Sequence, residues 1–167
     1  MSYMKINYDD IDPDMDFEVI PINFHHLVIN PDKRIYVVLE DENETQAGVE
    51  VNQYEASMIS FVQKGLHQNS HINTIHQLFI KALQLNQIKI QEVIIESKVG
   101  DIIYCTLKMV DSKNNVAYNV LSLADGIILS RITNCPLKSL AYVWDDFDQI
   151  DEWDYEDYIV DIDPDED

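Results

Sequence analysis

The sequence NTIHQLFIKALQLNQIKIQEVIIE, residues 73–96, decides the fold. Thr74 caps a predicted helix, and Gln77 lies three residues later, where its side chain reaches back to the backbone N–H of the cap. Asn86 tolerates the left-handed geometry that ends helices. Residues 88–97 are rich in β-branched side chains, which favour a strand. The predicted helix places its apolar residues on one face at helical period: Ile75, Leu78, Phe79, Ala82 and Leu83.

The residues before this stretch read as three strands and one helix. Pro21 suits the start or the edge of a strand, and Gly65 lies near the end of the helix. A hairpin is the simplest connection between the second and third strands. We expect strands over 17–29, 34–40 and 47–51, a helix over 53–66, and a polar loop over 67–71.

The residues after it read as an antiparallel meander, a third helix and a short strand. Ser122 is the predicted cap of that helix, and Asp125 completes a capping box. Asn134 and Pro136 end it. Strands in blocks rather than in alternation with helices predict an α+β domain with a mixed, largely antiparallel sheet and about three helices. We expect strands over 88–97, 102–110, 116–121 and 137–144, and the third helix over 123–132.

The charge of the chain is concentrated at its two ends. The 167 residues carry a formal net charge of −20, from 31 acidic and 11 basic residues. Residues 145–167 hold 13 acidic residues and no basic one, and residues 1–18 hold six acidic residues and one lysine. Residues 19–144 keep 12 acidic and 10 basic residues, a net charge of −2. The sequence therefore predicts an acidic arm over 1–16, one domain over 17–144, and an acidic, aromatic-containing tail over 145–167.

Composition argues against several classes of protein. No run approaches about 18 apolar residues, so we expect no membrane span, and the first 16 residues lack the apolar core of a signal peptide. Cys105 and Cys135 show no metal-binding spacing, which predicts two free thiols in a cytoplasmic protein. His67 and His71 are four apart, but their polar neighbours favour a loop over a metal site. Only four glycines are present, which excludes a glycine-rich phosphate loop.

Three short segments carry a resemblance to a known family. They are Tyr54-Glu55-Ala56, Ile75-His76-Gln77-Leu78 and Ser122-Leu123-Ala124-Asp125, each at the start of a predicted helix. Together with the spacing between them, they make residues 17–144 resemble the bifunctional nuclease (BFN) domain. The resemblance implies a compact homo-oligomeric domain that hydrolyses DNA or RNA with a divalent metal, Mg²⁺ or Mn²⁺. It also implies that His76, Asp125 and Glu55 are the catalytic residues.

The chain departs from the family pattern at the same segments. Gln77 replaces an aspartate, residues 72–73 replace an Arg-Pro pair, and residues 122–124 replace Arg-Pro-Ser. Two arginines suited to phosphate oxygens are therefore absent, as is one carboxylate. The near-neutral body also lacks the basic surface that phosphate-backbone binding normally uses. These departures keep a second hypothesis open: a catalytically degenerate member that acts as a protein-interaction or regulatory module through its acidic tail.

Each candidate residue also has a purely structural interpretation. Asp125 fits a capping box with Ser122, and Glu55 fits the first turn of a helix, where the macrodipole favours an acid. His76 is consistent with a local hydrogen bond between apolar neighbours. The tail has three open interpretations: a flexible solubilising segment, a segment that docks on a basic protein partner, or one that docks on this protein's own surface.

Overall fold

The chain passes from one β-sheet into another near its first described residues. The computed structural model describes residues 18–69, 73–150 and 153–159. Strand β1 (Val19–Pro21) pairs antiparallel with β8 (Leu137–Leu140), whereas β2 (Asn23–Ile29) pairs with β3 (Ile35–Glu40). Between them Ile22 is 2% exposed. The single strand predicted over 17–29 is wrong, because Pro21 has no N–H with which to continue one ladder and the chain changes sheet there.

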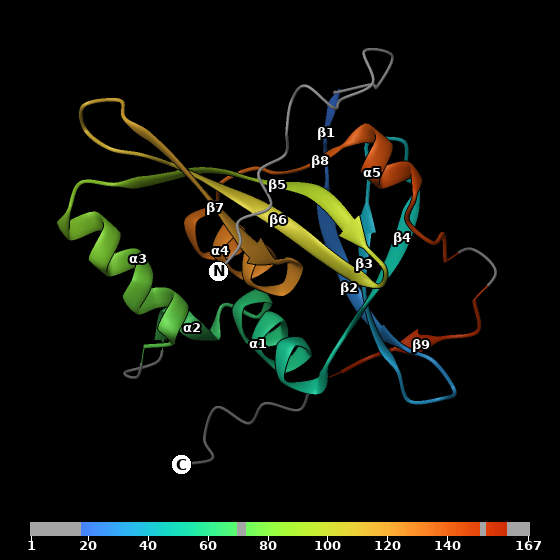
Figure 1. Ribbon diagram of the computed structural model, residues 1–167. Helices are drawn as coiled ribbons and strands as arrows, with labels where there is room; N and C mark the ends of the chain where they lie inside the picture. Colours follow the sequence, from blue (N-terminus) through green and yellow to red (C-terminus); the bar gives the residue numbers. More distant parts are fainter. Residues whose placement is uncertain (1–17, 70–72, 151–152, 160–167) are drawn as a thin grey trace.

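The two sheets are mixed and mostly antiparallel. The five-stranded sheet has the order β1-β8-β5-β6-β7, and the four-stranded sheet the order β4-β3-β2-β9. Only β5 and β8 pair in parallel. The α+β class, the β3–β4 hairpin and the β5–β6–β7 meander are confirmed (Figure 1). The remaining strands are β4 (Gln46–Val51), β5 (Lys89–Val99), β6 (Ile102–Val110), β7 (Val116–Ser122) and β9 (Glu156–Asp157).

The described residues form five helices, two more than predicted. Gly65, at a φ of 72°, turns the chain after α1, and the short α2 replaces much of the loop expected over 67–71. The strand expected over 137–144 stops at Leu140, where α5 begins, although the N–H of Ala141 still donates to the carbonyl of Glu18 (2.7 Å), next to β1. The helices are α1 (Gln53–Gln63), α2 (Leu66–Asn69), α3 (Ile75–Leu85), α4 (Leu123–Thr133) and α5 (Ala141–Asp145).

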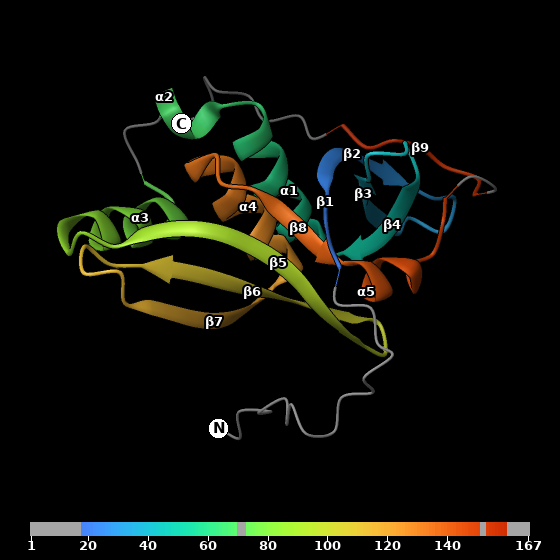
Figure 2. The same ribbon diagram turned by 90° about the horizontal axis from the view of Figure 1, so that it is seen from above.

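Helix α4 lies at the centre of the main core. That core joins both sheets through α1 and α4, which lie on the same side of the five-stranded sheet (Figure 2). A Cβ added at Gly126 would lie 3.0 Å from Val93 Cγ1 and 3.1 Å from Cys105 Sγ, so the helix backbone packs directly against β5 and β6. Six of its residues are buried: Leu123, Ala124, Gly126, Ile127, Ile128 and Leu129.

Helix α3 has the caps that the sequence predicts but not a buried stripe. Thr74 and Gln77 form the capping box. The left-handed residue at its C-terminal end is Gln87 (φ 57°) rather than Asn86 (φ −98°). No residue of α3 is buried, and Ile75 is 81% exposed. Residues 73–96, which the sequence marks as the centre of the fold, are therefore central only in part: β5 is the middle strand of its sheet, whereas α3 lies outside the core.

The acidic tail returns to the body of the protein. We call residues 145–150 and 153–159 the C-terminal strap. Gly48 on β4 donates its N–H to the carbonyl of Asp148 (3.0 Å), and Gln149 forms an isolated bridge with Ala47. Strand β9 pairs with β2, at the opposite edge of the four-stranded sheet (Figure 1). The strap thus contacts β4 at one edge of that sheet and supplies β9 at the other.

Apolar side chains attach the strap to the sheet. Ile150 is 1% exposed and forms a small core with Val28 and Val38, separate from the main core. Trp153 packs edge-on against Tyr36, with ring centroids 4.8 Å apart. Of the three interpretations of the tail, docking on this protein's own surface therefore describes residues 145–150 and 153–159.

Two further expectations concern the ends of the chain and the membrane. The acidic arm over 1–16 and residues 160–167 lie outside the described residues. Within residues 18–69, 73–150 and 153–159, no helix is long and apolar enough to cross a bilayer.

Candidate active site

Two helix N-termini bring His76 and Asp125 together. His76 is the second residue of α3, whose start is fixed by the Thr74–Gln77 capping box. Asp125 is the third residue of α4, which is capped by Ser122. His76 Nε2 lies 2.8 Å from Asp125 Oδ1, although the two residues are 49 apart in sequence. The structure therefore pairs two of the three residues that the resemblance marks.

The carboxylate of Asp125 bonds to His76 rather than completing a capping box. Ser122 Oγ accepts the backbone N–H of Asp125 (3.2 Å), which is one half of the predicted box. The Asp125 carboxylate does not accept the backbone N–H of Ser122. In α1 and α3 the equivalent bond to the cap residue is present. The structural interpretation of Asp125 thus accounts for its backbone, while its side chain makes a tertiary contact.

The environment of the imidazole selects its tautomer. We assign the proton to Nε2, because a bare Nε2 would place its lone pair against a carboxylate oxygen. Nδ1 is buried and has no hydrogen-bond partner in the described part of the chain. In this arrangement His76 donates Nε2–H to Asp125.

The pair lies at the edge of a broad, largely apolar groove of about 760 Å³. The side chain of His76 is 17% exposed and that of Asp125 is 51% exposed, so the carboxylate is the more accessible group. Within the described part of the chain, no lysine or arginine lines the groove. The residues that line it come from α1, α3, α4, the end of β7 and the segment before α3: Tyr54, Met58, Phe61, Asn73, Thr74, Ile75, His76, Phe79, Leu121, Asp125 and Leu129.

Glu55 is not brought to this pair. Its carboxylate accepts the backbone N–H of Asn52 (3.0 Å), and its own N–H bonds to Asn52 Oδ1 (2.8 Å), which completes the capping box of α1. Its neighbour Tyr54 lines the groove instead and is 73% exposed. The structure thus supports the capping interpretation of Glu55 and adds Tyr54, which sequence analysis did not single out.

Lys81 is a cation near the rim that sequence analysis also missed. Its Nζ donates to Asn73 Oδ1 (2.9 Å), and Asn73 lines the groove. Lys81 is five residues beyond His76 and its side chain is on the surface. Helical periodicity does not place Lys81 beside His76. Its hydrogen bond to Asn73, the residue before the Thr74 cap, links it to the site.

The described residues do not form a three-ligand metal site. No group of three or more His, Cys, Asp or Glu side chains within the described ranges could hold a metal ion. His76 Nε2 is engaged with Asp125, and Glu55 caps α1. The donor set at the groove therefore does not fit a protein-held Mg²⁺ or Mn²⁺. Of the two histidines that are four residues apart in the sequence, His67 lies in α2, and His71 lies outside the described residues.

No family model matches the chain, and a search of the curated proteins finds no significant match. The resemblance to the BFN domain therefore rests on the three helix-start segments and their spacing.

Proposed function

We propose that the chain is a BFN-type domain that hydrolyses phosphodiester bonds in DNA or RNA, with Asp125 as its proton acceptor and His76 as the residue that positions Asp125. The observation that carries the proposal is their 2.8 Å contact. Two residues that the resemblance marks independently, 49 positions apart, meet at the edge of a groove large enough for nucleotides. Local capping explains the backbone at each position but does not require the side chains to meet.

The exposure of the two groups suggests their roles. Asp125 is half exposed and lines the groove, so its carboxylate is the group that accepts a proton from an attacking water. His76 is a positioning residue that donates Nε2–H to Oδ1 and holds the carboxylate in place. Helices α3 and α4 both begin at the groove, and helix N-termini attract anions such as phosphate. These dipoles take over part of the role of the missing arginines.

A nuclease assay with volume-conserving variants tests the proposal. Asp125→Asn and His76→Gln should each lower the cleavage rate by about 10²–10⁴-fold on the preferred substrate. Single- and double-stranded DNA and RNA are assayed with Mg²⁺, with Mn²⁺ and with EDTA, which also decides the metal requirement. Glu55→Gln is the matched control, because it alters a carboxylate that the structure places in a cap, and it should retain the wild-type rate. An inactive wild type, or full activity in both variants, rejects the proposal.

A second function is favoured by the apolar character of the groove and the acidic strap. No cationic side chain lines the groove, whereas hydrolysis of a phosphodiester develops negative charge that needs cationic help. The strap docks through Ile150 and Trp153 and leaves Asp154 and Glu156 exposed. A catalytically inactive interaction module would present these acids to a basic protein.

Charge neutralisation on the strap separates this alternative from the nuclease. The Asp154→Asn, Glu156→Gln double variant keeps the apolar contacts and should bind a lysine-rich model peptide more weakly than wild type at low salt. The difference should shrink at high salt, because salt screens exposed charges. Equal binding by both proteins contradicts the interaction module, whatever the nuclease assay shows.

We also propose that the protein self-associates, as the resemblance implies. Strand β7 is at the edge of the five-stranded sheet and carries Val116, Tyr118 and Val120, each more than 45% exposed. Its seven residues include no lysine, proline or bulge that would protect an edge from pairing. Light scattering of wild type and Val120→Lys tests this. A monomeric wild type contradicts it.

A further inference from the structure

A second cavity lies between α1, α4, β2 and β8, and it shares no lining residue with the groove at His76. Its volume is about 360 Å³, within the range of small-molecule sites. Its floor is aliphatic and buried: Ile22, Ile59 and Ile128 are each 2% exposed. Its mouth is open to solvent, because Asn23, Gln63 and Arg131, which also line it, are exposed.

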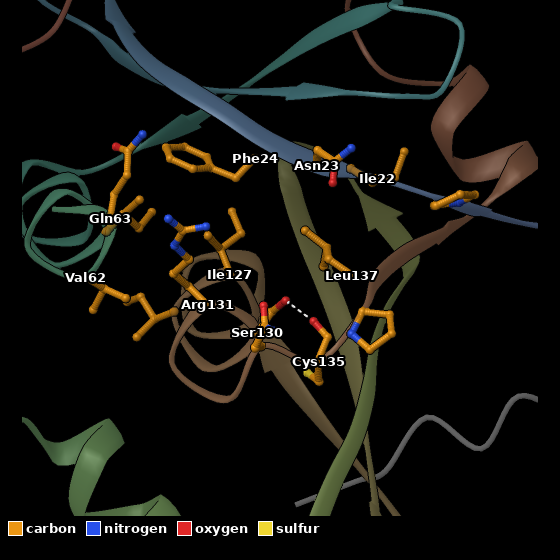
Figure 3. Close-up of a pocket in the computed structure, with 15 residues that line it drawn as sticks. Ile22, Asn23, Phe24, Val62, Gln63, Ile127, Ser130, Arg131, Cys135 and Leu137 are labelled. Atoms are coloured by element: carbon orange, nitrogen blue, oxygen red, sulfur yellow. Dashed lines mark hydrogen bonds between the residues drawn. The ribbon is translucent and has the colours of Figure 1, made fainter. Parts of the chain in front are cut away.

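One cation projects into this cavity from α4. The side chain of Arg131 extends toward Phe24 on β2, with Ile127 beside it and Gln63 of α1 on the other side (Figure 3). Within the described residues, Arg131 makes no hydrogen bond or ion pair, although its charge helps to lower the pKa of the nearby His67. Among the residues that the structure describes, no aspartate or glutamate lines the cavity. The guanidinium therefore has donors available for an incoming anion.

Neutral polar groups surround the guanidinium. The side-chain amides of Asn23 and Gln63 line the cavity and bond to no other described side chain or backbone group. Ser130 Oγ donates to the carbonyl of Cys135 (2.7 Å), so that hydroxyl proton is already used (Figure 3). The cavity thus combines one free cation, two free amides and an apolar floor.

We propose that this cavity binds a small monocarboxylate with an apolar body, and that Arg131 pairs with its carboxylate. The planar fork of arginine matches a carboxylate with two parallel hydrogen bonds. One guanidinium balances one negative charge, and no second lysine or arginine lines the cavity to balance a phosphate dianion. The aliphatic floor selects an acid with a hydrocarbon body over a small polar acid such as formate.

Titration calorimetry with a matched set of probes tests the proposal. The probes are phenylacetate and hexanoate, their uncharged amides, and phenyl phosphate. Wild type should bind both carboxylates, and Arg131→Gln should weaken that binding by about 10- to 100-fold, the value of a charge-assisted hydrogen bond. Arg34→Gln is the control, because Arg34 is the other arginine of the chain and lines a different cavity. Methyl NMR shifts at Ile127 and Leu137 should locate the ligand.

Each other outcome contradicts the proposal. If no carboxylate binds at millimolar concentration, or if wild type and Arg131→Gln bind the carboxylates equally, the proposed site does not exist. Equal affinity for the amides shows that the cation is not the anchor, and tighter binding of phenyl phosphate rejects the ligand class. A comparable loss in Arg34→Gln, or shifts confined to the groove at His76, places the ligand elsewhere. Circular dichroism of each variant first establishes that it is folded.

Discussion

Helices α3 and α4 have the same length and opposite relations to the core. Both span 11 residues and both begin with a side-chain cap. Helix α3 carries one apolar stripe and buries none of its residues, whereas α4 is apolar on nearly all sides and buries six. An apolar stripe shows which face of a helix avoids water, but it does not show what covers that face. A helix that is apolar all round has no face for solvent and has to lie inside the fold.

A matched pair of leucine truncations gives the largest expected effect. Leu123 on α4 is 4% exposed, and Leu78 on α3 is 52% exposed. Leu123→Ala should lower the free energy of unfolding by about 2–5 kcal/mol, because it leaves a cavity. Leu78→Ala should change it by only about 0.5 kcal/mol in the monomer. Urea denaturation at low protein concentration measures both, and equal costs would contradict the contrast between the helices.

The strap extends the contrast, because its acidic composition suggests that it lies in solvent, yet Phe147 and Ile150 are buried. A Cβ at Gly48 would lie 2.6 Å from Trp153 Cζ3 and 2.7 Å from Ile150 Cγ2. Gly48→Ala should therefore cost about 1–3 kcal/mol through overpacking. In a Trp153→Ala background the cost should fall, since one clashing ring is gone. A double-mutant cycle in urea measures the coupling, and strict additivity would show that the strap does not press on Gly48.

Below about pH 6.5, the protein should lose stability because of His67, which lies in α2 before the start of α3. Burial, with a smaller contribution from Arg131, lowers the pKa of His67 from its usual 6.5. The unfolded chain then binds the proton more readily than the native protein. His67 thus contributes stability above pH 6.5 that is lost as the pH falls, by at most about 1.4 kcal/mol per pH unit.

Urea midpoints of wild type and His67→Gln between pH 7.5 and 5.5 check this sign. The wild-type midpoint should fall more steeply than that of the variant. His26, whose pKa burial also lowers, keeps part of the slope in both proteins. A variant slope as steep as that of wild type would show that His67 does not titrate differently on folding.

The smallest expected effect is a difference in the chemical labelling of the two cysteines. Labelling of Cys105 reports whether α4 stays packed against β5 and β6. Both are free thiols, as the sequence predicts. Burial, with smaller contributions from Glu96 and Asp125, raises the pKa of the Cys105 thiol to about 12. A thiol reagent at pH 8 should therefore label one cysteine per native chain and two in urea. Cys135→Ser should abolish native labelling. Rapid labelling of native Cys105 would mean that α4 opens readily from β5 and β6.

The sequence predicts the structure correctly where the cause is local. The Thr74–Gln77 capping box and the end of α4 at Asn134, which is left-handed, both depend on residues a few positions apart. The sequence does not predict the end of β8 at Leu140. There the chain turns into α5, although Ala141 still donates its N–H to the carbonyl of Glu18 beside β1.

The candidate site likewise has features that the sequence predicts and features that it does not predict. The sequence places His76 and Asp125 each in the first turn of a helix. It cannot show that their side chains meet, because the angle between α3 and α4 follows from packing over 49 residues of intervening chain. The capping interpretation of Asp125 predicts its backbone bond and misses its side-chain bond for this reason. The free guanidinium of Arg131 gave no sequence signal, because its cavity is formed by four separate elements.

The amino-acid sequence determined the class of the fold, the starts of α1, α3 and α4, and the concentration of charge at the two ends of the chain. These properties come from periodicity, capping and composition, which act over a few residues. Only the tertiary structure decided that α3 buries none of its residues, that the strap crosses its own sheet, and that His76 contacts Asp125. These depend on which apolar surfaces find partners, and a surface without a partner, like that of α3, looks the same in sequence as one that is covered.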